Sequence, residues 1–367
     1  AAIKIDSRKI KDFFKRADIF LLAVCMICTI FGIVMIYSMT SSYGWAKYVV
    51  VQGFAMFLGI GAFVVFTVID PDLIADKWVY LTIFNVLFIV GLIFFGKGDE
   101  VGSRAWYRFA GIGVQPSEIV KVIFIVLIAK QMATYKEQRT LNKFPSVLKL
   151  GIHWALYFGL ITVIPNDLGS ALIFLAIFVV MLICAGIAWY WMAAAAAVVA
   201  AMIPLFWNFF LADYQKNRIL APYIPDVVDP TGQGITWQTN LCKDALASGR
   251  WTGVGFGEGS FSQSSYNARH TDCVFASIGE ELGMVACIAI IVLLSIIIIR
   301  CCVIGVRSGS PFGMLICFGV ATALAFQTFI NIGMCIGITP VIGITLPFFS
   351  YGGSSVVAMY AAVGLVS

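Results

Sequence analysis

One aspartate in a basic setting stands directly before a long apolar run. Asp272 follows Arg269 and His270, and the run begins with Cys273. One interpretation is that Asp272 caps the helix that the apolar run forms. The other is that it acts as a general base, because partial burial raises the pKa of an aspartate towards the range useful for proton abstraction, while a nearby cation lowers it again. The sequence leaves both interpretations open.

Charged residues inside or beside other apolar runs are the second chemical signal. Glu118 and Lys121 lie three residues apart, so on a helix they share one face and can neutralise each other. They form either a structural ion pair that packs the helix, or a site in which Lys121 offers its charge to an anionic substrate while Glu118 holds it in place. Asp167 precedes a further apolar run, where it either only caps a helix or also contributes to binding.

Two arginines lie close to aromatic residues in polar segments. Arg104 precedes Trp106, and Arg218 follows Tyr214. A guanidinium group suits bidentate binding of phosphate. The alternative for each arginine is that it extends to lipid headgroups at a membrane interface and does nothing else.

The remaining candidates favour packing over chemistry. The histidines, His153 and His270, are far apart in the sequence and predict no metal cluster. Most of the ten cysteines lie inside apolar runs, with only Cys242 and Cys273 near the polar stretch, so we interpret them as packing residues. The alternating glycines at 253–259 fail the GxGxxG spacing, and we interpret them as flexible backbone near a bulky polar substrate.

The elements that position these residues are predicted to be membrane helices. Of 367 residues, 61% are hydrophobic and only 12% are charged, whereas a soluble protein has roughly 25% charged residues. A membrane-spanning helix needs about 20 mostly apolar residues. The sequence therefore predicts an all-α polytopic membrane protein and excludes a cytosolic enzyme or a secreted disulfide scaffold. The ten apolar runs cover residues 18–39, 47–69, 78–96, 117–134, 147–164, 168–187, 189–211, 273–299, 311–337 and 352–367.

The distribution of Lys and Arg predicts the orientation of these helices. Basic residues are concentrated before the first run and between the fourth and fifth runs, which lie on the same side in a ten-helix count. Cytoplasmic loops are enriched in Lys and Arg, so both termini are expected to be cytoplasmic. Residues 1–17 are expected to form a basic interfacial segment on anionic lipid. The last run is short for a span, and we expect a tail to follow it.

Two long segments fall on the opposite, extracytoplasmic side. They cover about 97–116 and 212–272, and the second is rich in Trp, Tyr and Gly. Long loops in compact proteins are usually functional or disordered, so function is expected on the external face. The chain is expected to form a single integral membrane domain over 1–367, and its sequence gives no support for an inverted-repeat transporter.

A co-linear set of motifs over nearly the whole chain resembles the SEDS family of RodA, FtsW and SpoVE, with the RodA branch favoured. The resemblance implies a ten-helix peptidoglycan glycosyltransferase that polymerises lipid II on the outer face of the bacterial cytoplasmic membrane, beside a class B penicillin-binding protein. The family's essential loop aspartate falls on Asp272, its loop tryptophan on Trp106, and its helix-four pair on Glu118 and Lys121. The motifs lie at residues 115–121, 166–170, 229–238, 248–257, 270–283, 327–334 and 346–355.

The chain departs from the family pattern at three places. An aromatic residue commonly follows the aspartate where Cys273 stands, Gln-Pro often stands where this chain has Pro165-Asn166, and Leu-Pro is missing from 264–268. Because of these departures, the motifs do not distinguish between the elongation, division and sporulation branches.

The expected reaction is an inverting glycosyl transfer with release of undecaprenyl pyrophosphate. Asp272 would act as base on the acceptor hydroxyl or position a divalent cation. The pyrophosphate would be neutralised by Mg²⁺ or Mn²⁺, or by Arg218, Lys121 and Arg104.

No acidic cluster predicts a dedicated metal cage, and no organic cofactor or nucleic acid is expected. The alternatives are a lipid II flippase and a non-catalytic activator of the penicillin-binding protein.

Overall fold

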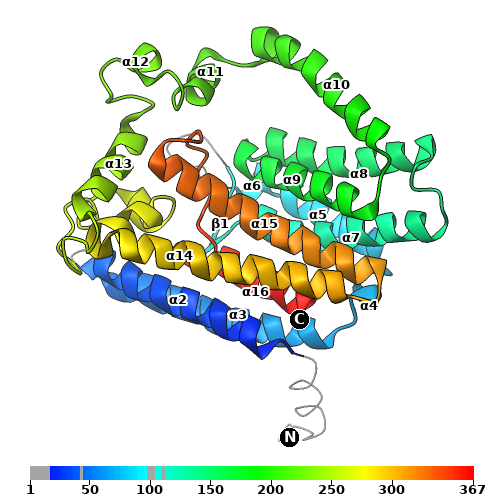
Figure 1. The fold of residues 1–367 in the computed structure, drawn as a ribbon, viewed down its shortest axis with the longest axis horizontal. Helices are drawn as coiled ribbons and strands as arrows, with labels where there is room; N and C mark the ends of the chain where they lie inside the picture. Colours follow the sequence, from blue (N-terminus) through cyan, green and yellow to red (C-terminus); the bar gives the residue numbers. More distant parts are fainter. Residues whose placement is uncertain (1–16, 42–43, 97–103, 110–111) are drawn as a thin grey trace, which may run out of the picture.

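The computed structural model describes residues 17–41, 44–96, 104–109 and 112–367 as a bundle of long helices (Figure 1). In chain order the helices are α2 (Ile19–Thr40), α3 (Trp45–Val68), α4 (Pro71–Ala75), α5 (Trp78–Val90), α6 (Leu92–Phe95), α7 (Pro116–Glu137), α8 (Phe144–Val163), α9 (Leu168–Ala185), α10 (Trp189–Leu205), η2 (Phe206–Phe210), α11 (Asp213–Leu220), α12 (Pro225–Val228), α13 (Trp237–Gly249), η3 (Asn267–His270), α14 (Val274–Arg307), α15 (Pro311–Ile336) and α16 (Gly353–Val366). The strands β1 (Tyr107–Phe109) and β2 (Ile112–Val114) form an antiparallel hairpin.

The ten predicted apolar runs each correspond to helical structure, with α5 and α6 sharing one run around Gly91. Within the described residues, eight helical segments are long and apolar enough to cross a membrane. The other two runs form α7, which carries several charged residues, and α16, which has 14 residues. The fold class was predicted correctly. The expected interfacial segment lies outside the described residues, apart from Ala17.

Burial within the bundle distinguishes a central group of helices from a peripheral one. Helices α7, α15 and α16 bury most of their residues, and α16 packs against α3, α7 and α15. By contrast, α10 has no buried residue and lies along the edge of the bundle (Figure 1). The buried helices are therefore the ones that can fix side chains in place.

The segment expected to be a long external loop is largely structured. It contains α11, α12, α13 and η3, and α13 packs against α14 and α15. In Figure 1, α13 lies at the opposite end of the long helices from α4. These short helices and the β hairpin were not predicted from the sequence.

Helix α14 has a sharp break that fixes the glycine run at 253–259. Gly283 has φ 76° inside the helix, and the amides of Val254 and Gly255 donate to the carbonyls of Glu280 and Glu281 just before the break. A Cβ atom on Gly253 would collide with the Glu281 carbonyl group. A Cβ atom on Gly259 would likewise lie 2.5 Å from the Glu280 carboxylate, and none of the four glycines lines the large cleft described below. The interpretation of the run as flexible backbone at a substrate was therefore wrong for Gly253 and Gly259, which close packing against α14 requires.

Replacing Gly283 by alanine is expected to lower stability by about 1–3 kcal/mol, because a non-glycine residue is strained at positive φ. The new Cβ would also collide with the Trp251 carbonyl oxygen. The matched control is Gly61→Ala in α3, where no heavy atom lies within 4 Å of the added Cβ and alanine favours the helix. Thermal unfolding of the purified variants measures the difference. Equal midpoints for the two variants would contradict this explanation.

Candidate functional site

A large cleft opens where the starts of five helices meet. Its volume is about 1830 Å³. The walls come from the N-terminal ends of α3, α7, α9, α14 and α16, together with α11, α13 and the segment after α15. In the ten-helix topology these ends all lie on one side of the protein. Polar groups from distant parts of the sequence therefore share one cavity, which is large enough for a bulky substrate.

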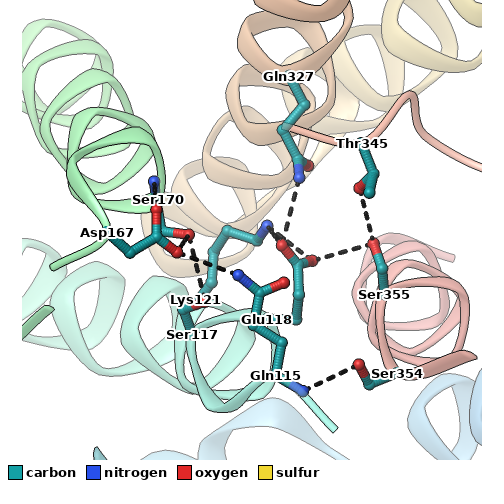
Figure 2. A network of polar contacts seen from close by, with 10 residues as sticks. All are labelled: Gln115, Ser117, Glu118, Lys121, Asp167, Ser170, Gln327, Thr345, Ser354 and Ser355. Carbon is teal, nitrogen blue, oxygen red and sulfur yellow. Dashed lines mark hydrogen bonds and ion pairs between the residues drawn. The ribbon is translucent and has the colours of Figure 1, made fainter. Parts of the chain in front are cut away.

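Glu118 and Lys121 form a buried ion pair at one end of this cleft. The Lys121 Nζ atom donates to both carboxylate oxygens of Glu118, at 3.0 and 2.9 Å. Their side chains are only 5% and 6% exposed, respectively. The amide of Gln327 and the hydroxyl of Ser355 also donate to Glu118, at 3.4 and 3.3 Å. Figure 2 shows that this carboxylate joins α7, α15 and α16.

The two partners of this pair differ in their access to the cleft. Glu118 lines it, whereas Lys121 does not. The predicted pairing on one helix face is therefore present. A lysine whose charge is already matched by a bidentate carboxylate is poorly placed to meet an anionic ligand, and Glu118 is the member of the pair that faces the cavity.

Asp167 caps α9 and also lines the cleft. One carboxylate oxygen accepts the Ser170 amide at 2.9 Å, and the other accepts the Ser170 hydroxyl at 2.6 Å and the Gln115 side chain at 3.0 Å (Figure 2). Burial raises the pKa of Asp167 above its ordinary value, and the donated hydrogen bonds oppose that shift. The predicted cap is confirmed, and the residue has a second place in the cavity wall.

Asp272 also lines the cleft. It lies on a short segment in which three successive main-chain carbonyl groups accept hydrogen bonds. The carbonyl oxygen of His270 accepts the Tyr351 amide at 2.9 Å, and that of Thr271 accepts the Ser350 hydroxyl at 2.5 Å. The Asp272 carbonyl accepts Nδ2 of Asn331 at 2.7 Å. Donors from α15 and from the segment before α16 therefore fix the backbone that carries the Asp272 side chain.

Asn331 ties this segment to the opposite wall. Its Nδ2 atom donates at 2.7 Å to the carbonyl of Asp272 and at 2.7 Å to that of Ile344. The side chain is fully buried. Ile344 follows Gly343, where an added Cβ would lie in van der Waals contact with the aspartate, 3.4 Å from Asp272 Oδ2. Asn331 was recognised as part of a motif, but its connection to Asp272 required the structure.

The surroundings of Asp272 bear on the first of its two predicted roles, the helix cap. Helix α14 begins at Val274 with Cys273 as the N-cap residue, so Asp272 lies outside the cap position. The neighbouring His270 is buried among aromatic rings, and desolvation together with the adjacent Arg269 lowers the pKa of His270 to about 4. His270 is therefore neutral at pH 7, and the cleft carries the aspartate beside an uncharged imidazole.

The basic residues that line the cleft are only partly those predicted. Arg218, on α11, lines it as expected, and so does Trp106 next to the β hairpin. Arg104 is exposed and does not line it. Lys47 and Arg108 do, although no sequence pattern singled them out. Their only signal was their position in segments predicted to lie on the same, extracytoplasmic side of the membrane.

Among the described residues, no group of three or more His, Cys, Asp or Glu side chains is arranged to hold a metal ion. The carboxylates that line the cleft are those of Glu118, Asp167, Asp244, Asp272 and Glu280. Mg²⁺ commonly binds one or two carboxylates together with substrate phosphates. The donor set at Asp272 fits an ion that arrives with a phosphorylated ligand, with the aspartate as the single carboxylate.

Comparison with known proteins gives consistent similarities over almost the whole chain. Residues 18–367 match the FtsW, RodA and SpoVE family, described as "Cell cycle protein". The chain is 32% identical over 315 residues to peptidoglycan glycosyltransferase MrdB of Escherichia coli K12, covering 84% of this chain and 82% of the relative. It is 31% identical over 364 residues to the probable peptidoglycan glycosyltransferase FtsW of Geobacter metallireducens, covering 96% and 94%.

Two solved structures have a similar fold. A chain from a structure described as coordinating polymerization and crosslinking in a peptidoglycan synthase complex superposes with a TM-score of 0.79, at 25% identity, covering 95% of this chain and 96% of that one. The rod shape determining protein RodA of Thermus thermophilus superposes with a TM-score of 0.70, at 22% identity, covering 95% of each chain. The helix arrangement described above is thus shared with these proteins.

Proposed function

Because this chain belongs to the FtsW, RodA and SpoVE family of cell cycle proteins and is a peptidoglycan glycosyltransferase, we propose that its large cleft is the site of glycosyl transfer and that lipid II is the substrate. The observation that carries this proposal is the rigidly held Asp272 in a cavity that also contains Glu118 and several basic side chains. A lipid-linked disaccharide with a pyrophosphate needs both a carboxylate and cations within one large site.

Asp272 is the proposed general base. It would accept the proton of the acceptor sugar hydroxyl as that oxygen attacks the anomeric carbon of the donor, and the pyrophosphate would leave from the opposite face. General base catalysis typically contributes about 10²–10⁴ in rate. The fixed carbonyls of residues 270–272 support this role, because a base must be held at the right distance and angle to its proton.

The leaving pyrophosphate requires positive charge. We assign this contribution to Arg218, Lys47 and Arg108, since these side chains line the cleft and fixed cations stabilise charge that develops in a transition state. In this scheme Lys121 acts only through its pairing with Glu118, and Arg104 lies outside the cleft. A divalent cation, Mg²⁺ or Mn²⁺, would supply further charge neutralisation when bound with the phosphates. Asp272 would hold this cation in its alternative role, in which it positions the ion instead of accepting the proton.

The proposed orientation places the cleft on the external face of the bacterial cytoplasmic membrane. The predicted cytoplasmic positions of the basic loops support this orientation. We propose a class B penicillin-binding protein as the partner, since the relative with a TM-score of 0.79 comes from a complex described as coordinating polymerization and crosslinking. The similarity to both MrdB and FtsW proteins supports a role in cell shape or division without separating these branches.

The function is tested by incubating the purified protein with lipid II and separating the products by size, with and without a chelator. Glycan strands formed without any partner would support the enzyme and oppose a merely activating role. A lipid II flippase predicts translocation in sealed vesicles without polymerisation, and that result would overturn the proposal. Loss of glycan only in the presence of chelator would establish the requirement for a divalent cation.

Replacing Asn331 by alanine is expected to reduce the maximal polymerisation rate by roughly 10²-fold, because small displacements of a reacting group have effects of this size. The change removes the donor shared by the Asp272 and Ile344 carbonyls. We expect the rate at saturating lipid II to fall, while the lipid II concentration that gives half of the maximal rate stays the same. Thr328→Val on the same helix is the control, since that hydroxyl bonds to the local Leu324 carbonyl. A wild-type rate for Asn331→Ala would refute this positioning role.

A further inference from the structure

Three cysteines from separate elements meet directly behind Asp272. Cys242 lies on α13, Cys273 is the N-cap residue of α14, and Cys335 lies near the end of α15. All three are free thiols and are at most 1% exposed. The interpretation of the cysteines as packing residues agrees with this burial, but it did not predict that these three positions, distant in the sequence, lie together.

The thiols contact one another and the backbone of the proposed base. Cys273 and Cys335 donate hydrogen bonds to the Cys242 sulfur, and these bonds lower the pKa of Cys242. The Cys335 Sγ atom lies 3.9 Å from the Asp272 carbonyl oxygen. Cys242 is therefore the thiol best suited to become a thiolate, which is the nucleophile in disulfide exchange.

Only a thin wall separates this cluster from the cleft. Gln238 lines the cleft, and its Nε2 atom donates to the Cys273 sulfur at 3.2 Å. Leu241, next to Cys242 in the sequence, also lines the cleft. Displacement of one or two side chains would thus expose the thiols to a small reagent entering from the cavity.

We propose that Cys242 and Cys273 form a thiol–disulfide exchange site whose oxidation state controls the position of Asp272. The proposal rests on the proposed function, which puts the cleft on the external side, where disulfides form and persist. Its natural oxidant belongs to the class of disulfide compounds, including the active-site disulfide of a thiol oxidoreductase. Cys335 is the third thiol, which packs against the pair and the Asp272 carbonyl.

The exchange proceeds in two balanced steps. The Cys242 thiolate attacks one sulfur of the external disulfide, forms a mixed disulfide and releases one thiolate. Cys273 then loses its proton to solvent and attacks the Cys242 sulfur, which forms the Cys242–Cys273 bond and releases the second thiolate. The two protein thiols lose two electrons and two protons, and the external disulfide is reduced to two thiols.

Bond formation would move the residue next to Asp272. Sulfur atoms in a disulfide are about 2.05 Å apart, closer than two hydrogen-bonded thiols. Cys273 would have to approach α13, and it would lose the geometry in which Gln238 donates to it. Because Asp272 precedes it directly, the carboxylate would shift as well, and a misplacement on the order of 1 Å costs about 10²-fold in rate.

The test uses 2-hydroxyethyl disulfide as a small neutral probe on the purified full chain. After incubation, the remaining thiols are alkylated, and the peptides are mapped by mass spectrometry without reduction. We expect a Cys242–Cys273 disulfide and at least about a 10-fold loss of lipid II polymerisation, both reversed by dithiothreitol. Separately alkylated Cys242 and Cys273, or a disulfide between Cys242 and Cys335 instead, would overturn the assignment.

Two variants make the test specific. Cys242→Ala should form no such cross-link and should polymerise lipid II equally with and without the probe. If Cys242→Ala folds poorly, Cys242→Val is used in its place. Cys28→Ala, in the buried Cys25–Cys28 turn of α2, should behave as wild type. Continued sensitivity of polymerisation in Cys242→Ala would overturn the proposal. Because peptide mapping needs no lipid II, it decides the thiol chemistry even if the proposed function fails.

Discussion

Replacing Asp272 by asparagine is expected to lower the initial rate of lipid II polymerisation by about 10²–10⁴, the usual contribution of a general base. Asparagine has nearly the same shape but cannot accept the proton in the same way. The main-chain carbonyl of residue 272 would still accept Nδ2 of Asn331, so the thermal midpoint should change little. Size separation of labelled glycan products measures the rate, and calorimetry or fluorescence measures the midpoint.

Asp213→Asn is the matched control for this substitution. Asp213 lies on α11, its side chain is 96% exposed, and it does not line the cleft. Its ion pair with Lys216 is at the surface, where such pairs contribute little. We expect wild-type polymerisation from this variant. If Asp272→Asn retained more than half of the wild-type rate, Asp272 would not be the base. Another carboxylate in the cleft would then have to accept the proton.

Replacing Lys121 by methionine is expected to destabilise the protein by about 3–5 kcal/mol, because removing one partner of a buried pair leaves the other charge uncompensated. Glu118 would keep the Gln327 and Ser355 hydrogen bonds, at 3.4 and 3.3 Å, but would lose its only ion-pair partner among the described residues. Thermal unfolding in detergent measures the loss. Lys130→Met, on the same helix, is the control, since its pair with Asp72 is 39% and 52% exposed.

The double variant Glu118→Gln, Lys121→Met separates stability from chemistry. Removing both charges should restore most of the thermal stability. We expect polymerisation to remain strongly reduced, because Glu118 is the member of the pair that lines the cleft. A double variant as unstable as Lys121→Met would contradict the electrostatic explanation. A stable double variant with wild-type polymerisation would show that the pair serves packing only.

The sequence predicted the membrane helices well because their signal is local. A long apolar run specifies a span almost by itself, and α2 at Ile19–Thr40 differs from the predicted 18–39 by one residue at each end. The same holds for the pairing of Glu118 with Lys121, which depends only on helical spacing. Properties that depend on residues close together in the sequence were therefore recovered without a structure.

The arrangement of the site depended on contacts between distant segments. The spacing around Lys121 showed that it could be neutralised, but not which partner would face the cavity. The cations Lys47 and Arg108 carried no motif, and their place in the cleft follows from how α3 and the β hairpin pack. Gly253 was assigned to a substrate because its partner, the break in α14 at Gly283, has no signature in the apolar pattern.

The way in which the Asp272 segment is anchored has a consequence for sequence variation. The bonds that hold residues 270–272 end on main-chain carbonyl oxygens, which every residue type supplies. Selection on Asp272 can therefore act on one side chain, while its neighbours drift without loss of the local conformation.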